Sequence, residues 1–158
     1  MRNTDEKWLK IAASEGKIGA RKGEGGPFGA CIVKNGVLVG RAHSEVIKRS
    51  NPCAHAEINA IRLACRQLKT IDLSGTTLYT SCEPCPMCMG AVLWARISKV
   101  VYGVGREKAT EIGFDHSLFY NYFSDQSIVR WLEVKEVKSR YCTDVMNNWL
   151  LNPRRQHY

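Results

Sequence analysis

The chain has 158 residues, of which 44% are hydrophobic and 24% charged, and its formal net charge is +8. This length and composition predict one globular domain over residues 1–158, and no stretch approaches the ~20 consecutive apolar residues of a membrane-spanning helix. The first six residues carry acids and no apolar run, so no secretory signal is expected. Seven cysteines, an odd number, favour a reducing compartment, and we therefore expect a cytoplasmic protein that does not contact a membrane.

The positive charge has two interpretations. A basic surface attracts RNA phosphates, or it simply keeps a protein in solution. Basic residues gather late in the chain, at Lys135, Lys138, Arg140, Arg154 and Arg155. Aromatic residues do not interleave with them as in a nucleic-acid-binding motif, so the pattern favours a solvated surface.

Segments with helical and strand patterns alternate along the chain. Asn35-Gly36, between two apolar runs, is a strong signal for a hairpin turn. We predict helices over residues 4–17, 54–68, 87–95 and 143–151, and strands over residues 28–34, 37–42, 76–80, 99–103 and 132–137. After residue 104 the pattern is less regular. The alternation predicts an α/β fold in which helices cover a sheet.

One histidine and two cysteines have the spacing of a metal site. His55 stands near the start of one predicted helix, and Cys85 and Cys88 stand three residues apart at the start of the next, so the two thiols share a face. Zn²⁺ accepts these ligands tetrahedrally, and three protein ligands leave the fourth position open, as in catalytic sites. Glu57 is not needed as a ligand and can act as general base and acid. We predict that two helix N-termini meet near the carboxyl end of the 76–80 strand and hold Zn²⁺ beside Glu57.

A structural zinc site or a redox pair is the alternative for the two cysteines. A structural site needs a fourth Cys or His, and Cys82 forms a second Cys-x-x-Cys with Cys85. The multi-part pattern favours catalysis, because a purely structural site has no use for Glu57.

Motifs spread over nearly the whole chain carry a family resemblance. They lie at residues 26–30, 55–57, 80–88 and 94–96. They resemble the cytidine deaminase superfamily of zinc-dependent nucleobase and nucleoside deaminases, whose signature is His-x-Glu followed by Pro-Cys-x-x-Cys. Within that superfamily the chain is most similar to the bacterial guanine deaminases, through residues 111–117 and the tail at residues 154–158.

The resemblance implies a fold, an assembly and a set of site residues. The fold is a three-layer α/β/α arrangement around a five-stranded mixed sheet, and the assembly is a homodimer that exchanges its C-terminal tail, about residues 142–158. Tyr158 would then close the partner's active site. The other implied substrate-binding residues are Phe28, which would stack on the ring, Ala56, which would offer backbone contacts, and Ser44, Glu83, Asp115 and His116.

Two positions depart from the guanine deaminase pattern. That family usually has Asn eleven residues before the zinc histidine, where this chain has Ser44, and a second Asp after Gly-Phe-Asp, where this chain has His116. A hydroxyl and an imidazole do not reproduce the hydrogen bonds of an amide and a carboxylate. Since a site built for one base edge rejects analogues that leave its polar groups unpaired, the two positions indicate a changed base recognition unless Asp115 or Glu83 compensates.

The sequence thus predicts zinc-dependent hydrolytic deamination of a small aminated heterocycle, with guanine as the first choice of substrate. Ser44 and His116 leave open an aminotriazine, a pterin, cytosine, isoguanine or guanosine instead. A tRNA adenosine deaminase is a second alternative, which the positive charge favours and residues 113–117 and the tail oppose. A non-catalytic, zinc-stabilised binding protein is a third, which Glu57 opposes. The ligand set favours zinc over iron.

Overall fold

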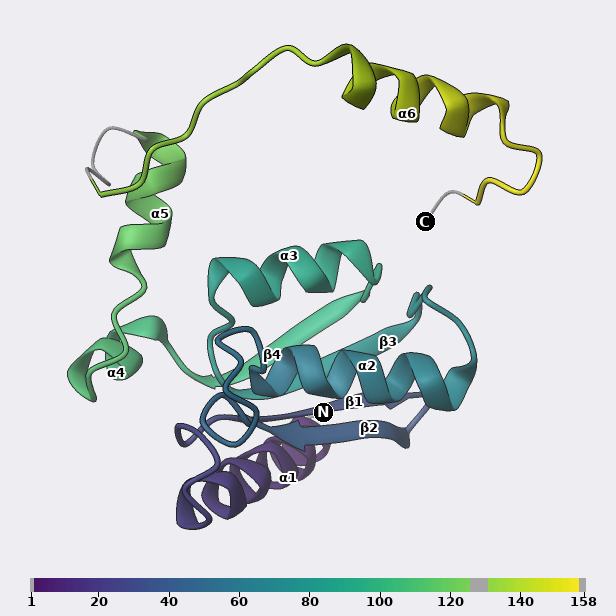
Figure 1. Cartoon of the computed structure of the whole chain (residues 1–158). Helices are drawn as coiled ribbons and strands as arrows, with labels where there is room; N and C mark the ends of the chain where they lie inside the picture. The colour runs from purple at the N-terminus through teal and green to yellow at the C-terminus, as the bar shows by residue number, and fades with distance from the viewer. Residues whose placement is uncertain (1, 126–130, 157–158) are drawn as a thin grey trace.

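Figure 1 presents the computed structural model of the chain, in which residues 2–125 and 131–156 are described. The helices are α1 (Arg2–Arg21), α2 (Ala56–Leu68), α3 (Pro86–Trp94), α4 (Arg106–Glu111), α5 (Ser117–Ser124) and α6 (Arg140–Leu151). The strands are β1 (Gly29–Lys34), β2 (Val37–His43), β3 (Thr76–Cys82) and β4 (Lys99–Val104). Every predicted helix and four of the five predicted strands are confirmed with shifted ends, whereas α4 and α5 were not predicted. None of the described helices is long and apolar enough to cross a membrane.

The four strands form one mixed sheet in the order β2-β1-β3-β4. β1 runs antiparallel to both β2 and β3, and β3 runs parallel to β4. Asn35 and Gly36 join β1 to β2 with φ angles of 50° and 76°. Positive φ at both central residues is the geometry of the type I′ hairpin turn, so the Asn-Gly signal is confirmed.

Helices cover both faces of the sheet, as Figure 1 shows. On one face α1 packs through Trp8 against Cys31, Val33 and Tyr79 of the strands. On the other face the core holds residues from β1, β2, α2, β3 and α3, namely Ala30, Ile32, Val39, Ala56, Ala60, Ala64, Leu78 and Val92. The predicted three-layer arrangement is therefore present in the described residues.

Two glycines explain why α1 runs beyond the predicted end at Lys17. A Cβ on Gly16 would lie 2.6 Å from the carbonyl oxygen of Pro27, and one on Gly19 would lie 2.6 Å from the ring of His43. Glycine usually weakens a helix, but here its missing side chain lets α1 approach the sheet closely.

The predicted strand at residues 132–137 is wrong for the described chain, and the sheet has four strands instead of the five that the resemblance implied. A strand needs a neighbour for its backbone hydrogen bonds, and this stretch runs between α5 and α6, away from the sheet (Figure 1). Val134 and Val137 are 64% and 72% exposed. Polar and apolar residues alternate over residues 132–137, but among the described residues this segment pairs with no strand of the sheet.

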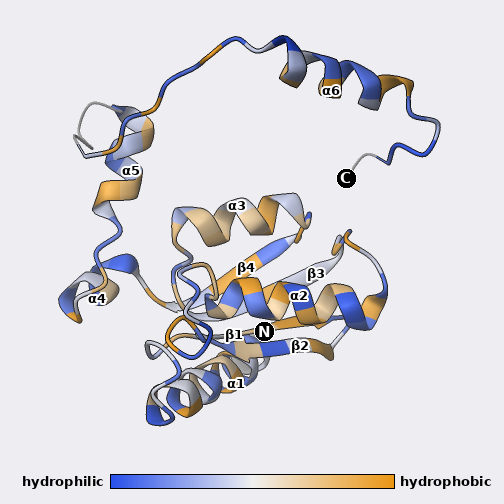
Figure 2. Cartoon of the chain, viewed as in Figure 1, coloured by the Kyte–Doolittle hydropathy of each residue, from blue (hydrophilic) through white to orange (hydrophobic). Residues whose placement is uncertain are grey.

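Residues 117–125 and 131–156, which we name the C-terminal arm, differ from residues 2–116, which we name the body. The arm carries α5 and α6 away from the three layers in Figure 1, and Figure 2 shows apolar positions along both helices. Neither helix has a buried residue. Phe123, Trp131 and Tyr141 are 76%, 78% and 86% exposed. The arm therefore buries little apolar surface against its own chain.

Candidate metal centre and substrate pocket

Local sequence places three metal-ligating side chains at two helix starts. His55 is the N-cap of α2, and Cys85 is the N-cap of α3. The buried Asn59 amide donates to the carbonyls of His43 and Ala54, which ties the start of α2 to the end of β2. Pro86 begins α3, where its fixed φ and missing N–H suit the first helical position.

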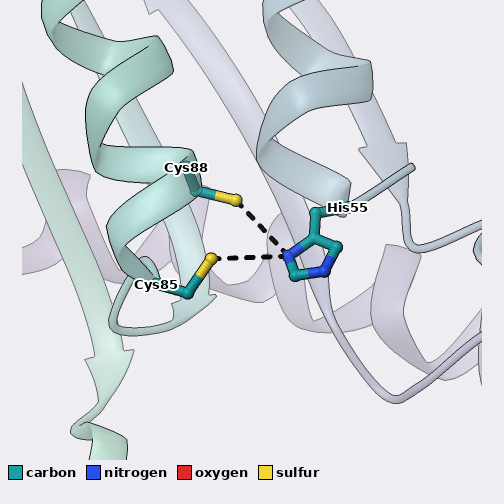
Figure 3. A group of neighbouring side chains, drawn as sticks. All are labelled: His55, Cys85 and Cys88. Atoms are coloured by element: carbon teal, nitrogen blue, oxygen red, sulfur yellow. Dashed lines mark hydrogen bonds between the residues drawn. The ribbon is translucent and has the colours of Figure 1, made fainter. Parts of the chain in front are cut away.

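The three donor atoms converge, as Figure 3 shows. His55 Nδ1 lies 3.6 Å from Cys85 Sγ and 3.5 Å from Cys88 Sγ. A tetrahedral zinc ion with ordinary Zn–N and Zn–S bonds separates these atoms by about 3.5 Å. The chemistry and spacing of the donors therefore fit Zn²⁺. His55 enters as a cap residue rather than in the first helical turn, where we had predicted it.

The third cysteine of this region, Cys82, points away from the metal-ligating group. Cys82 Sγ donates to the carbonyl oxygen of Gly105 at 3.8 Å, and in the described residues it is not part of the metal-ligating group. The described site thus offers three ligands and not the closed set of four that a structural zinc site uses.

Hydrogen bonds shift the protonation of two ligands. The hydrogen bond with Cys88, followed by that with His55, lowers the pKa of the Cys85 thiol to about 4. The hydrogen bond with Cys85 raises the pKa of His55 above its ordinary value. A thiolate is the form of cysteine that binds metals, so Cys85 is prepared for this role.

Glu57 lies in the first turn of α2, buried beside the ligands. Its side chain accepts hydrogen bonds from Thr80 Oγ1 at 3.0 Å and from Cys88 Sγ at 3.4 Å. Only 6% of Glu57 is exposed, and this burial raises the pKa of its carboxyl above the ordinary range. A carboxyl with a raised pKa can both accept and return a proton near neutral pH.

A cavity of about 460 Å³ opens over these groups, with His55, Glu57 and Cys85 in its wall. Its apolar lining consists of Phe28, Val46, Ile47, Pro52 and Phe114. The rings of Phe28 and Phe114 meet edge to face with centroids 4.9 Å apart. A Cβ on Gly26 would lie 2.8 Å from the Phe28 ring and 3.0 Å from the Phe114 ring, so glycine is needed there. The pocket therefore suits a flat, aromatic ligand.

The family model for the zinc-binding region of cytidine and deoxycytidylate deaminases matches residues 2–104. The chain belongs to this deaminase family. Its members use zinc to remove an amino group from a nucleobase by hydrolysis, and the chain is thus a zinc-dependent hydrolytic deaminase.

Individual relatives of this deaminase fall into two groups. Guanine deaminase of Bacillus subtilis is 47% identical over 115 residues, which cover 73% of this chain and 74% of that protein. A solved structure of guanine deaminase from Bacillus subtilis matches with a TM-score of 0.92 and 38% identity, covering 97% of this chain and 98% of that chain. The tRNA-specific adenosine deaminase of Bacillus subtilis is 46% identical over 99 residues, which cover 63% of this chain and 61% of that protein.

The pocket of the deaminase includes most of the residues predicted to bind substrate. Besides Phe28, its lining contains Ser44, Glu83 and His116. Ser44 is buried at the end of β2, and Glu83 Oε2 also accepts a hydrogen bond from the backbone N–H of Arg106 at 3.0 Å. The two positions that depart from the guanine deaminase pattern therefore face the same cavity.

Two predicted residues lie outside the lining of this pocket, and a third is not described. Asp115 lines a neighbouring cavity, and its carboxylate accepts hydrogen bonds from the backbone N–H and the hydroxyl of Ser117, both at 2.8 Å. Ala56 is fully buried in the first turn of α2 and is not part of the described pocket lining. Tyr158 lies outside the described residues.

Thr80 and Phe114 have positions at the site that sequence reasoning had not assigned. Thr80 lies fully buried in β3 and donates to Glu57. A threonine at a strand end gives no local signal of such a contact, which depends on how α2 crosses β3. Phe114, by contrast, lies within residues 113–116, which the sequence had already marked.

Proposed function

We propose that the chain deaminates guanine by hydrolysis, giving xanthine and ammonia. The match to a guanine deaminase structure over 97% of the chain carries this proposal, because it extends beyond the zinc motifs that all members of the family share. The pocket agrees with it, since it combines a zinc-binding triad, a buried carboxylate and two aromatic walls. In the cell we place this reaction in the cytoplasm, where the free cysteines of the chain would stay reduced.

The residues of the chain divide the work of this reaction. Phe28 and Phe114 receive the purine ring and exclude water from its faces. Zinc held by His55, Cys85 and Cys88 would act as a Lewis acid and make water nucleophilic at neutral pH. Glu57, whose raised pKa results from burial, takes one proton from the attacking water and gives it to the ring nitrogen. It then takes the second proton from the new hydroxyl on the substrate carbon and gives it to the amine, so that the C–N bond breaks, a C=O bond forms and ammonia leaves. Thr80 holds one oxygen of Glu57 and so aims the other toward the ligand cluster.

Base recognition rests on Ser44 and His116. The far edge of guanine presents both hydrogen-bond donors and acceptors, and a hydroxyl and an imidazole can each supply either. A substrate with a different edge, such as an aminotriazine or a pterin, is the alternative for this same catalytic centre. The variants Ser44→Asn and His116→Asp restore the residues usual in guanine deaminases, and we expect them to change kcat/KM for guanine relative to isoguanine by about 10-fold or more. Equal changes for all substrates would show that these two residues do not discriminate among bases.

The C-terminal arm supports a homodimer in which each arm crosses to the partner. Its apolar residues are exposed in a single chain, and so are Leu93 and Trp94 at the end of α3, at 72% and 68%. Several large apolar side chains exposed together usually mark a surface that contacts another protein. In such a dimer Tyr158 of one chain would close the pocket of the other.

A tRNA adenosine deaminase is the second candidate, favoured by 46% identity to such an enzyme over 99 residues. A solved structure from work on tRNA:A34 deaminases covers 63% of this chain with a TM-score of 0.61, whereas the guanine deaminase structure covers 97% with a TM-score of 0.92, which favours the smaller substrate.

The deciding experiment measures ammonia release by the purified, zinc-loaded protein from guanine, guanosine, cytosine, adenine, isoguanine, aminotriazines and pterins, with a tRNA arm beside them. We expect strong release from guanine and none from the variant Glu57→Gln. Ammonia release from another compound but not from guanine would show that the substrate is that compound, and the proposed mechanism would still apply. Release from tRNA alone would overturn the proposal in favour of the second candidate.

A further inference from the structure

A second cavity, of about 260 Å³, lies at the outer edge of the sheet. It shares no lining residue with the substrate pocket. Arg41 of β2, Arg49 of the following loop, and Arg62 and Arg66 of α2 line it. Glu15 of α1 lines it too, so the cavity lies beside the outer strand β2, with side chains of α1, β2 and α2 around it.

The two acids in this cavity already have cationic partners. Glu15 Oε1 lies 3.3 Å from Arg41 Nε, and Glu45 Oε2 lies 2.6 Å from Arg49 Nε. Lys48 Nζ adds a second cation to Glu45 at 3.0 Å. Four guanidinium groups thus face two carboxylates, and the lining keeps an excess of positive charge.

Arg62 and Arg66 supply that excess. Neither guanidinium forms an ion pair or a hydrogen bond with another described residue. They stand four residues apart on α2, so the two like charges lie on one face and repel each other. An anion placed between them would relieve this repulsion and receive hydrogen bonds from both.

The paired arginines can also contribute to such an anion. A guanidinium has five N–H donors, and each of Arg41 and Arg49 uses its Nε on a carboxylate, which leaves the terminal nitrogens free to donate. Their side chains are 61% and 50% exposed, so a ligand can reach them from solvent. The planar guanidinium fork matches pairs of phosphate oxygens particularly well.

We propose that this cavity binds a phosphate-bearing anion of metabolite size, such as a diphosphate or a nucleotide through its phosphates. The four guanidinium groups gather around one hollow of about 260 Å³, and such a cluster of planar forks suits the several oxygens of a phosphoryl group. The site is independent of deamination, because none of its arginines lines the substrate pocket.

The test is calorimetric titration of the full-length, zinc-loaded protein with inorganic pyrophosphate, adenosine 5′-diphosphate and a short single-stranded oligoribonucleotide at low salt. The variant Arg62→Gln/Arg66→Gln removes the excess charge from the cavity. The variant Lys10→Gln/Lys17→Gln removes the same charge from exposed positions on α1 and serves as the matched control. Guanine deamination and thermal midpoints are measured for every protein.

We expect pyrophosphate to bind the wild type, to bind the arginine variant at least 10-fold more weakly, and to bind the lysine variant within 2-fold of the wild type. Tighter binding of the nucleotide than of pyrophosphate would identify a nucleotide as the ligand. Binding of pyrophosphate without binding of the nucleotide would identify the free anion as the ligand. Absence of binding, or equal weakening in both variants, overturns the proposal. Binding of the oligoribonucleotide alone overturns it as well and makes this face a nucleic-acid contact. Unchanged deamination in the arginine variant separates any of these results from the fate of the proposed function.

Discussion

The body and the C-terminal arm of this deaminase treat their apolar residues in opposite ways. In the body, Ile32, Leu73 and Leu78 are fully buried, and the two sides of the sheet form separate cores. In the arm, α5 and α6 have apolar residues at helical spacing but bury none of them. An amphipathic helix gains its stability from covering an apolar partner. The comparison teaches that the metal-ligating group and its pocket belong to the packed body, whereas the arm leaves its apolar side chains uncovered by the described residues of its own chain.

The largest effect expected from this division is on catalysis, because the metal-ligating group and Glu57 lie in the body. Glu57→Gln keeps the size of the side chain and removes its ability to accept a proton, so guanine deamination should fall about 10²–10⁴-fold while the zinc content stays that of the wild type. The measurement is kcat beside metal analysis of the same sample. Glu107→Gln, at a side chain 79% exposed, is the control and should retain full activity. Substantial turnover by the Glu57 variant would contradict the assignment.

The next largest effect is on the stability of the body. Leu78 is fully buried in β3, and Leu78→Ala should lower the free energy of unfolding by about 2–5 kcal/mol, since it leaves a cavity in the core. Chemical denaturation measures this loss. The loss should be the same at low and high protein concentration, because the contacts of Leu78 lie within one chain. A concentration-dependent loss would mean that the core of the body forms only in an assembly.

A smaller effect, confined to association, is expected in the arm. Trp131 is 78% exposed, and Trp131→Asp should weaken the dimer at least 10-fold because it places a charge where we propose that the partner packs. Sedimentation over a range of concentrations measures this change. Ile71, 59% exposed in the body, provides the matched control, and Ile71→Asp should leave association unchanged. A wild-type protein that stays monomeric at all concentrations would remove the contrast between body and arm.

The same contrast explains which features could be predicted from the sequence. In the body, local signals decide the structure: the Asn35-Gly36 turn, the proline that begins α3, and the spacing of Cys85 and Cys88 each need no knowledge of distant residues. The metal-ligating group followed from them because His55 and Cys85 both stand at helix starts. Predictions failed where distant contacts decide. Thr80 reaches Glu57 only because α2 crosses β3, and α1 continues beyond its predicted end through Gly19, where it lies close to His43 of β2.

In the arm, the apolar residues follow strand-like and helix-like patterns, but the described residues of the chain do not cover them. Residues 132–137 alternate as a strand does, yet within residues 2–125 and 131–156 they pair with no strand. α4 and α5 were missed because they are short and follow an irregular stretch, where periodicity over six or eight residues cannot distinguish a helix from a loop. The carboxylate of Asp115 accepts hydrogen bonds from Ser117 at the start of α5, and the contact with substrate that the resemblance implies for Asp115 stays a prediction.

The smallest predicted effect tests how α1 is attached to the sheet within the body. Tyr79 donates from its hydroxyl to Asp5 Oδ1 at 2.7 Å, and Lys99 lies 3.4 Å from Asp5 Oδ2. The hydrogen bond from Tyr79 lowers the pKa of Asp5 below 3.8, and burial together with Asp5 raises the pKa of Tyr79 to about 12. Tyr79→Phe should therefore lower the thermal midpoint at pH 7 by about 2–4 °C.

The pH dependence of that loss identifies its cause. A carboxyl whose folded pKa is depressed stabilises the fold above its unfolded pKa, and this contribution disappears as the pH falls through the folded value. A phenol whose folded pKa is raised stabilises the fold below its unfolded pKa near 10, and this contribution disappears as the pH rises toward about 12. The difference between wild type and Tyr79→Phe should thus be largest between about pH 5 and pH 9 and should shrink at both ends. A difference that stays the same below about pH 5 and above about pH 9 would mean that Tyr79 holds α1 through the packing of its ring against Trp8 and not through its hydrogen bond.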